Sequence, residues 1–144
     1  MKRGRPLRRR TPLRQVSPRR ASRGRSARSG TGPTLTVRLL VLQRDGWACV
    51  LCGGRDDLQL HHRKPRRMGG RADGSPINSP ANLVTLCADD HAWAESRRAE
   101  ALDMGLLLHE ADDPEQVPVL TTRRGPIYLD DVGGWRSATG DGAQ

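Results

Sequence analysis

The stretch CVLCGGRDDLQLHHRKP, residues 49–65, and the later stretch NLVTLCADDHAWAE, residues 82–95, decide how this chain folds. The first holds a Cys-x-x-Cys pair followed by two adjacent histidines. The second holds a third cysteine and, four residues later, another histidine. Thiolates and imidazoles are common ligands of zinc and related divalent cations. The order of these residues therefore predicts two metal sites in one small domain.

The three cysteines, Cys49, Cys52 and Cys87, are better explained by a metal than by disulfides. Three cysteines cannot all pair, and no βαβ pattern surrounds the Cys-x-x-Cys pair as in a thioredoxin-like redox motif. A closed structural zinc site needs four ligands. Asp90 follows Cys87 at the spacing of Cys49 and Cys52, so we expect it to be the fourth ligand, although it could instead only cap a helix. The alternatives for this position are Asp89, His91 and a water molecule.

The adjacent histidines, His61 and His62, follow a stretch that alternates like a strand over residues 58–61. Neighbours on a regular strand point to opposite faces, so both could serve one site only where the strand ends. Lys64-Pro65 provides that ending. One imidazole could then bind a cation while the other takes a proton from water, because its pKa lies near neutral pH. His91, in the first turn of the next helix, would lie opposite His61.

Two histidines on a divalent cation leave open positions for phosphate oxygens and water, which favours phosphodiester hydrolysis. Glu95 lies one helical turn after His91 and could add a ligand, orient His91, or be an ordinary solvated residue. Asn82 begins the return strand, where its side chain could hold the loop backbone and so fix the histidine pair. An ordinary turn residue is the alternative for Asn82, and Asn78 is its rival for the role.

The hydrophobic pattern predicts a small α+β fold. A short helix over 35–45 is expected to stop at Asp45-Gly46. Strands over 58–61 and 82–87 are expected to form a hairpin with a long loop, followed by a helix that begins at Asp89 or Asp90 and runs to about Met104. Two further strands, 117–121 and 126–130, are expected to form a C-terminal hairpin that turns at Arg124-Gly125.

The positive charge is concentrated at the N-terminus. The net charge is +9, yet residues 1–30 hold 12 of the 25 Lys and Arg residues and no acid, so residues 31–144 hold 13 basic and 16 acidic residues. An arm of this kind binds polyanions such as DNA or RNA, and a localisation or solubility tail is the alternative. We expect a disordered arm over 1–33, a folded domain over 34–132 and a flexible tail over 133–144.

The segment after the histidine pair is basic and rich in glycine. Its cations are expected to grip phosphates, contacts that position a nucleic acid without reading its sequence. These residues are Arg63, Lys64, Arg66, Arg67 and Arg71. No apolar run is long enough for a signal peptide or a membrane span, so we expect no membrane partner and a cytoplasmic location.

At these residues the chain resembles the HNH endonucleases, the ββα-metal nucleases. The resemblance extends from about Val41 to Gly105 and rests on motifs in a specific order. These motifs are Arg44-Asp45-Gly46, Cys49-x-x-Cys52-Gly53, Leu60-His61-His62, Gly69-Gly70, Asn82-Leu83-x-x-Leu86-Cys87 and His91. On weaker motifs, the Arg-rich arm and the C-terminal stretch with Val117-Pro118-Val119 and Leu129-Asp130-Asp131 are similar to small HNH proteins of actinobacterial phages.

The resemblance implies a zinc-stapled ββα-metal core with a flanking N-terminal helix and a C-terminal β-hairpin. In such a core His61 and His91 would bind a catalytic Mg²⁺, Mn²⁺ or Ni²⁺, His62 would be the general base, and Asn82 would brace the hairpin loop. The structural Zn²⁺ ligands would be Cys49, Cys52, Cys87 and Asp90, with Asp90 in place of the last cysteine of the family's Cys-x-x-Cys-His ending.

The implied activity is that of a metal-dependent endonuclease that nicks or cuts DNA. The same resemblance implies a phage or prophage protein that acts in the cytoplasm of a bacterial host cell. Its expected partners are DNA, held mainly through its phosphates, and phage packaging proteins. The alternatives are a zinc-ribbon module that binds nucleic acid without catalysis and a nuclease that acts on RNA.

Overall fold

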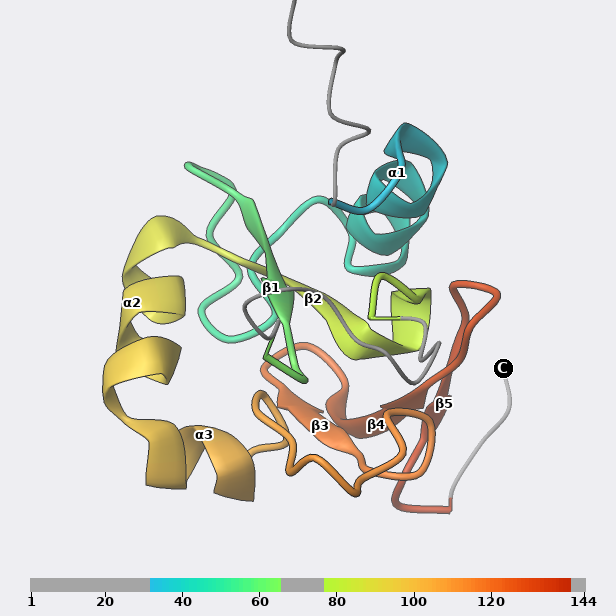
Figure 1. Ribbon diagram of the computed structural model, residues 1–144. Coiled ribbons are helices and arrows are strands. Elements are labelled where there is room, and N and C mark those ends of the chain that lie inside the picture. Colours follow the sequence, from blue (N-terminus) through green and yellow to red (C-terminus); the bar gives the residue numbers. More distant parts are fainter. Residues whose placement is uncertain (1–31, 66–76, 141–144) are drawn as a thin grey trace, which may run out of the picture. The chain divides into compact units, whose positions relative to one another are not determined.

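The computed structural model describes residues 32–65 and 77–140 (Figure 1). The described elements are α1 (Leu35–Arg44), β1 (Gln59–His62), the 3-10 turn η1 (Pro80–Asn82), β2 (Leu83–Leu86), α2 (Ala88–Ser96), α3 (Arg98–Asp103), β3 (Val119–Thr121), β4 (Gly125–Leu129) and β5 (Trp135–Ser137). The strands form two small antiparallel sheets, one of β1 and β2 and one of β3, β4 and β5. The predicted α+β class is therefore confirmed.

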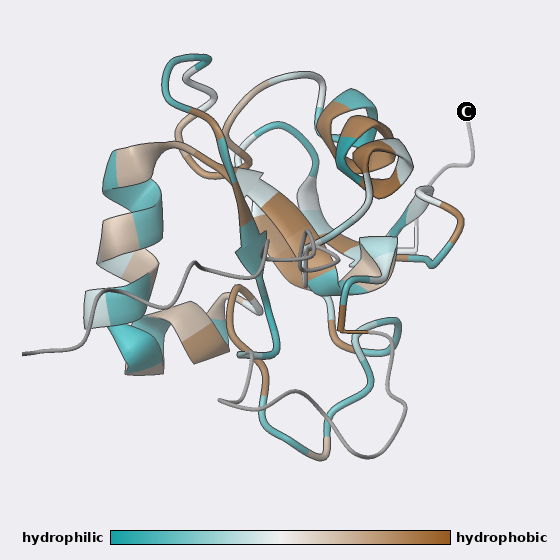
Figure 2. Cartoon of the chain, turned by 45° about the horizontal axis from the view of Figure 1, so that its top comes forward, coloured by the Kyte–Doolittle hydropathy of each residue, from teal (hydrophilic) through white to brown (hydrophobic). Residues whose placement is uncertain are grey.

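The first sheet is the predicted hairpin. β1 pairs antiparallel with β2, with Gln59 opposite Leu86 and His62 opposite Leu83. β2 is buried along its whole length and appears as the brown strand near the centre of Figure 2. α2 follows β2 directly and contacts both strands. The hairpin and α2 together carry all the histidines that the sequence assigns to the catalytic site.

α1 confirms the helix expected over 35–45. Its first turn is capped by the Thr34 hydroxyl, which accepts a hydrogen bond from the Val37 amide at 3.3 Å. At the other end the Gly46 amide donates to the Gln43 carbonyl and the Trp47 amide donates to the Leu42 carbonyl. This pair of bonds is a Schellman ending, which needs a left-handed residue such as Gly46, whose φ is 71°.

A buried ion pair joins the end of α1 to β2. The Arg44 guanidinium donates to both carboxylate oxygens of Asp45, at 2.8 and 3.1 Å, and also to the carbonyls of Pro80 and Leu83. Asp45 in turn accepts a hydrogen bond from the Thr85 amide at 2.8 Å. A buried ion pair stabilises a fold only when its remaining hydrogen-bonding capacity is satisfied, as it is here. The Arg-Asp pair therefore fixes α1 against the hairpin.

The helix expected from Asp89 or Asp90 to Met104 is two helices. α2 ends at Ser96 and α3 begins at Arg98, with Arg97 between them at φ −112° and ψ 58°. The break allows Ala94 of α2 and Ala101 of α3 both to be fully buried. The cap also differs from expectation, because Cys87 is the N-cap and its Sγ accepts a hydrogen bond from the Asp90 amide at 3.4 Å.

The C-terminal sheet has one strand more than the predicted hairpin. β3 pairs with β4, as expected, and β5 pairs with β4 on the other side, with Leu129 opposite Trp135. The stretch from residue 133, expected to be a flexible tail, thus contributes a strand. A turn makes this pairing possible, because the Gly134 amide donates to the Asp130 carboxylate at 2.6 Å.

The core lies between the two sheets and the helices. It combines Val84 and Leu86 of β2 with Leu106 and Leu107, which follow α3. Val119, Ile127 and Leu129 supply the apolar side of the C-terminal sheet. Within residues 32–65 and 77–140, no helix has both the length and the apolar character that crossing a membrane requires.

Candidate metal centres

The three cysteines and Asp90 converge on one point. Their ligand atoms all lie within 4.8 Å of one another. The Cys49 thiol donates to Asp90 Oδ2 at 2.9 Å and the Cys87 thiol donates to the same oxygen at 3.3 Å. The sulfurs of Cys52 and Cys87 are 3.7 Å apart, and all three cysteines are free thiols. The chain therefore holds a group of three thiols and one carboxylate that could bind a metal ion.

The electrostatics of this group oppose ionisation of the thiols as long as no cation is present. A hydrogen bond with Asp90 is the main reason that the pKa of Cys52 is raised to about 12. Burial, followed by the bond to Asp90, raises the pKa of Cys49. Burial acts to raise the pKa of Asp90, but its hydrogen bonds with the three thiols together lower it. Four groups that become anions on deprotonation share this small volume, which favours a bound cation.

The second cluster is formed by His61, His91 and Glu95, whose ligand atoms also lie within 4.8 Å of one another. His61 is 1% exposed, and its Nε2 is 3.0 Å from the Leu106 carbonyl oxygen. A carbonyl can only accept, so Nε2 carries the hydrogen and the lone pair lies on Nδ1. That Nδ1 is buried without a hydrogen-bond partner and lies 4.0 Å from Glu95 Oε1. A buried nitrogen whose lone pair faces a carboxylate is well placed to bind a metal ion together with that carboxylate.

His91 is oriented in a matching way. Its Nδ1 is 2.7 Å from the side-chain oxygen of Gln59, which fixes the hydrogen on Nδ1 and leaves the lone pair on Nε2. The rings of His61 and His91 meet edge to face, with centroids 4.8 Å apart. Burial, followed by the neighbouring His91, lowers the pKa of His61 to about 4. His61 is therefore neutral at pH 7, the form in which a histidine binds a metal.

His62 lies outside this group of converging ligand atoms. Its Nε2 is 3.0 Å from Asn78 Oδ1. Because that oxygen only accepts, Nε2 carries the hydrogen and Nδ1 carries the lone pair. Asn78, which the sequence suggested as a rival of Asn82, thus fixes the tautomer of His62.

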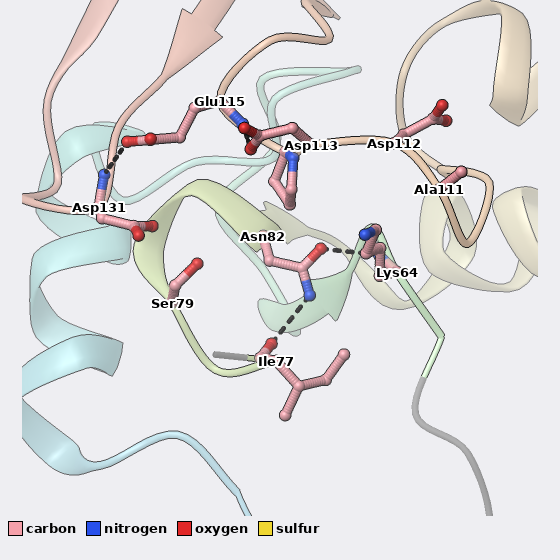
Figure 3. Close-up of a pocket in the computed structure, with 10 residues that line it drawn as sticks. Lys64, Ile77, Ser79, Asn82, Ala111, Asp112, Asp113, Glu115 and Asp131 are labelled. Carbon is pink, nitrogen blue, oxygen red and sulfur yellow. Dashed lines mark hydrogen bonds between the residues drawn. The ribbon is translucent and has the colours of Figure 1, made fainter. Parts of the chain in front are cut away.

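Asn82 holds the backbone on both sides of the long loop between the strands. Its Oδ1 accepts a hydrogen bond from the Lys64 amide at 2.8 Å, and its Nδ2 donates to the Ile77 carbonyl at 2.8 Å (Figure 3). The bracing expected from the sequence is therefore present. Asn82 also lines a pocket of about 270 Å³ whose charged lining residues are acidic, except for Lys64. The acidic residues of this pocket are Asp112, Asp113, Glu115 and Asp131.

Arg63 was expected to contact phosphates, but the structure buries it among backbone carbonyls instead of exposing it. Its side chain is fully buried, and its guanidinium donates to the carbonyls of Gly105 and Val117 at 2.7 and 2.6 Å. It also donates to the carbonyls of Ala81 and Pro114. Burial, followed by the charge of Arg44, lowers the pKa of Arg63 to about 10, so it stays protonated near neutral pH. Arg63 therefore joins the hairpin to the segment after α3.

Lys64 also differs from the expectation, because only 9% of it is exposed, against the acidic pocket. The other three cations of the expected phosphate grip, Arg66, Arg67 and Arg71, lie outside the described residues, as does the arm up to Thr31.

Substitution of Arg63 by Ala is expected to lower the free energy of unfolding by about 3 kcal/mol or more, because two buried and two partly buried carbonyls lose a charged donor. Arg63→Lys should also destabilise, since an ammonium cannot reproduce the planar fork. Arg38→Ala, at an exposed position on α1, is the control and should stay within about 0.5 kcal/mol. Urea unfolding measures all three, and parental stability of both Arg63 variants would contradict this role.

The structure adds two orienting groups that the sequence reasoning missed, the Leu106 carbonyl and Gln59. Gln59 could have been predicted from the sequence, because it lies two residues before His61 on β1 and so points to the same face of the sheet. The role of the Leu106 carbonyl could not have been predicted, since every residue has a backbone oxygen. No protein-family model matches the chain. Searches of curated proteins and of solved structures found no match either.

Proposed function

We propose that this protein is a metal-dependent endonuclease of the HNH type, which hydrolyses phosphodiester bonds in DNA. The observation that carries the proposal is the cluster of His61, His91 and Glu95. In each histidine, one ring nitrogen donates a hydrogen bond to a protein oxygen, and the other ring nitrogen carries the lone pair that a metal ion needs. Such partners orient metal ligands and raise their basicity. The order hairpin then helix, with one ligand on β1 and two on α2, supports the resemblance to a ββα-metal core.

The thiol group would hold a structural zinc ion. Zinc bonds to sulfur at about 2.3 Å, and in a tetrahedron two such sulfurs lie about 3.8 Å apart. The observed separation of 3.7 Å between the sulfurs of Cys52 and Cys87 fits that value. Asp90 completes the four ligands from the first turn of α2. Zinc would thus join the knuckle before β1 to the start of the helix that carries His91.

His62 is proposed as the general base. A bound divalent cation would polarise the scissile phosphate and stabilise the leaving oxygen. His62 would use Nδ1 to take a proton from the attacking water, since Nε2 is engaged with Asn78. The hydroxide forms a bond to phosphorus as the bond from phosphorus to the leaving oxygen breaks. Asn78 and Asn82 would keep the imidazole in position by fixing its tautomer and the nearby loop ends.

A plasmid assay tests the activity. Zinc-loaded protein, freed of other divalent cations, is mixed with supercoiled plasmid and then with Mg²⁺, Mn²⁺ or Ni²⁺. We expect nicked or linear products only after a cation is added. Equal incubations with single-stranded DNA and with RNA identify the substrate class. Absence of cleavage with every cation would refute the proposal and favour a module that only binds nucleic acid.

The Arg-rich arm is expected to bind phosphates of any sequence. Deletion of residues 1–33, which keeps the capping residue Thr34, should weaken binding to all duplexes and flatten the salt dependence. Each phosphate contact contributes about −0.9 to the slope of log K against log salt for duplex DNA. Fluorescence anisotropy over a range of salt concentrations measures this slope. An unchanged slope would mean that the arm does not contact DNA.

A further inference from the structure

A second group of basic and aromatic side chains lies in the C-terminal sheet and at the end of α1. The Arg124 guanidinium lies over the Trp135 ring, 4.5 Å from its centroid, and donates to the Arg44 carbonyl at 2.9 Å. The Arg123 guanidinium lies against Gly46, where a Cβ would collide with it. Both arginines thus reach from the turn between β3 and β4 toward the residues just before Trp47. We call Trp47, Arg123, Arg124 and Trp135 the arginine–tryptophan surface.

Trp47 has an unfavourable backbone conformation and an exposed side chain. Its φ is 54°, in the left-handed region that bulky side chains rarely adopt. Yet 49% of the residue is exposed, and Trp135 is 44% exposed. A strained backbone conformation that does not bury a large ring is typical of a binding position rather than of the core. Exposed tryptophans are also the residues on which unpaired bases stack.

The charge of the region suits an anion. The carboxylate that acts on Arg124 among the described groups is Asp45, while Arg44 and Arg123 act on it as like charges. Asp45 is already engaged by Arg44 in the buried ion pair. Guanidiniums held against a ring or a backbone carbonyl keep outward N–H groups for phosphate oxygens. The strand pair β4–β5, which carries Trp135, has a second such contact, with the Arg136 guanidinium 4.0 Å from the centroid of the Tyr128 ring.

We propose that the arginine–tryptophan surface binds a single strand of nucleic acid, with bases stacked on the tryptophans and phosphates held by Arg123 and Arg124. β5 and α2 lie at opposite sides of the fold in Figure 1. Trp135, on β5, therefore lies on the side of the fold away from α2, which carries His91 and Glu95. The inference rests on the proposed function only in taking nucleic acid as the ligand, and it does not depend on cleavage.

Two substitutions test the surface with the full-length, zinc-loaded chain. Trp47→Asn removes the ring and keeps a residue that tolerates positive φ. Arg123→Ala removes an exposed guanidinium, and Arg97→Ala, an exposed arginine paired with Glu100, is the control with the same charge change. The probes are a fluorescein-labelled oligothymidylate and a labelled duplex of equal length. Raised salt suppresses the contribution of the arm.

Trp47→Asn is expected to weaken binding of the single strand by about 5-fold to about 150-fold, the range for loss of one stacked base. Its duplex affinity should change little, and Arg97→Ala should match the parent. Arg123→Ala should weaken single-strand binding and reduce its salt dependence. Quenching of tryptophan emission by the oligonucleotide should shrink in Trp47→Asn. Thermal unfolding confirms that each variant folds.

Parental single-strand affinity of Trp47→Asn and Arg123→Ala would overturn the proposal. Equal losses for single strand and duplex would overturn it too, because they would indicate phosphate contacts without stacking. The plasmid assay is read separately. If the parent never cleaves but Trp47→Asn loses the single strand, the surface stands and the nuclease assignment fails. If the parent cleaves and the variants bind the single strand normally, the nuclease assignment stands and the surface proposal fails.

Discussion

Replacement of His62 by Ala is expected to lower the rate of DNA cleavage by about 10²–10⁴-fold, the usual contribution of a general base. Fold, metal content and DNA affinity should stay close to those of the parent, because His62 is only partly buried and lies outside both groups of converging ligand atoms. Single-turnover nicking of plasmid measures the rate. His109→Ala, at an exposed histidine far along the chain from the pair, is the matched control and should cleave normally.

Asn78 provides a second test of the same role. Asn78→Ala removes the acceptor that holds the hydrogen on His62 Nε2, so the rate should fall without loss of metal. Parental nicking by His62→Ala would exclude His62 as the base.

Loss of one thiol of the proposed zinc site is expected to be the most destabilising change. Structural zinc contributes about 10–16 kcal/mol of apparent binding free energy in zinc-finger peptides, and that energy is coupled to folding. Cys52 is exposed, so Cys52→Ser tests the metal with little effect on packing. A decrease of only about 2 kcal/mol in the free energy of unfolding would lower the Tm of a domain of about 100 residues by about 8–16 °C. The zinc content of purified protein and its thermal unfolding measure both effects.

Asp90 is the informative position, because a carboxylate is a harder and usually weaker zinc partner than a thiolate. Asp90→Cys is expected to raise zinc affinity and Tm without lowering the cleavage rate. Asp90→Asn is expected to lower zinc affinity and Tm. Asp89→Asn, at the exposed neighbouring position, is the control and should match the parent. Zinc affinity is measured by competition with a chromophoric chelator. Parental affinity of Asp90→Asn would remove Asp90 from the ligand set.

The elements that the sequence predicted well are those with local signals. α1 has a cap and a glycine ending, β1 and β2 have alternating or apolar runs, and the cysteine spacing placed Asp90 beside the thiols. The α+β class follows from these elements. The sequence also predicted that His91 lies opposite His61 and that Glu95 could add a ligand. The three ligand atoms do converge, because a hairpin followed by a packed helix brings their faces together.

Arg63 shows why other parts could not be predicted. In the sequence it begins a basic run and resembles a solvated cation. Its burial depends on carbonyls at positions 81, 105, 114 and 117, which come close only in the folded chain. β5 is a similar case, since Trp135 and its neighbours follow two glycines and gain a strand only by pairing with β4. Nonlocal partners decide both outcomes.

Binding of Mn²⁺ to the histidine cluster tests the central claim most directly. Zinc-loaded parent and His91→Ala are titrated with Mn²⁺ while the signal of free Mn²⁺ is followed by electron paramagnetic resonance, and plasmid nicking is measured in the same samples. We predict that the parent removes Mn²⁺ from solution and nicks DNA as the site fills, and that His91→Ala does neither. Mn²⁺ binding and nicking by His91→Ala at parental levels, or nicking by the parent in the absence of any added cation, would contradict the account.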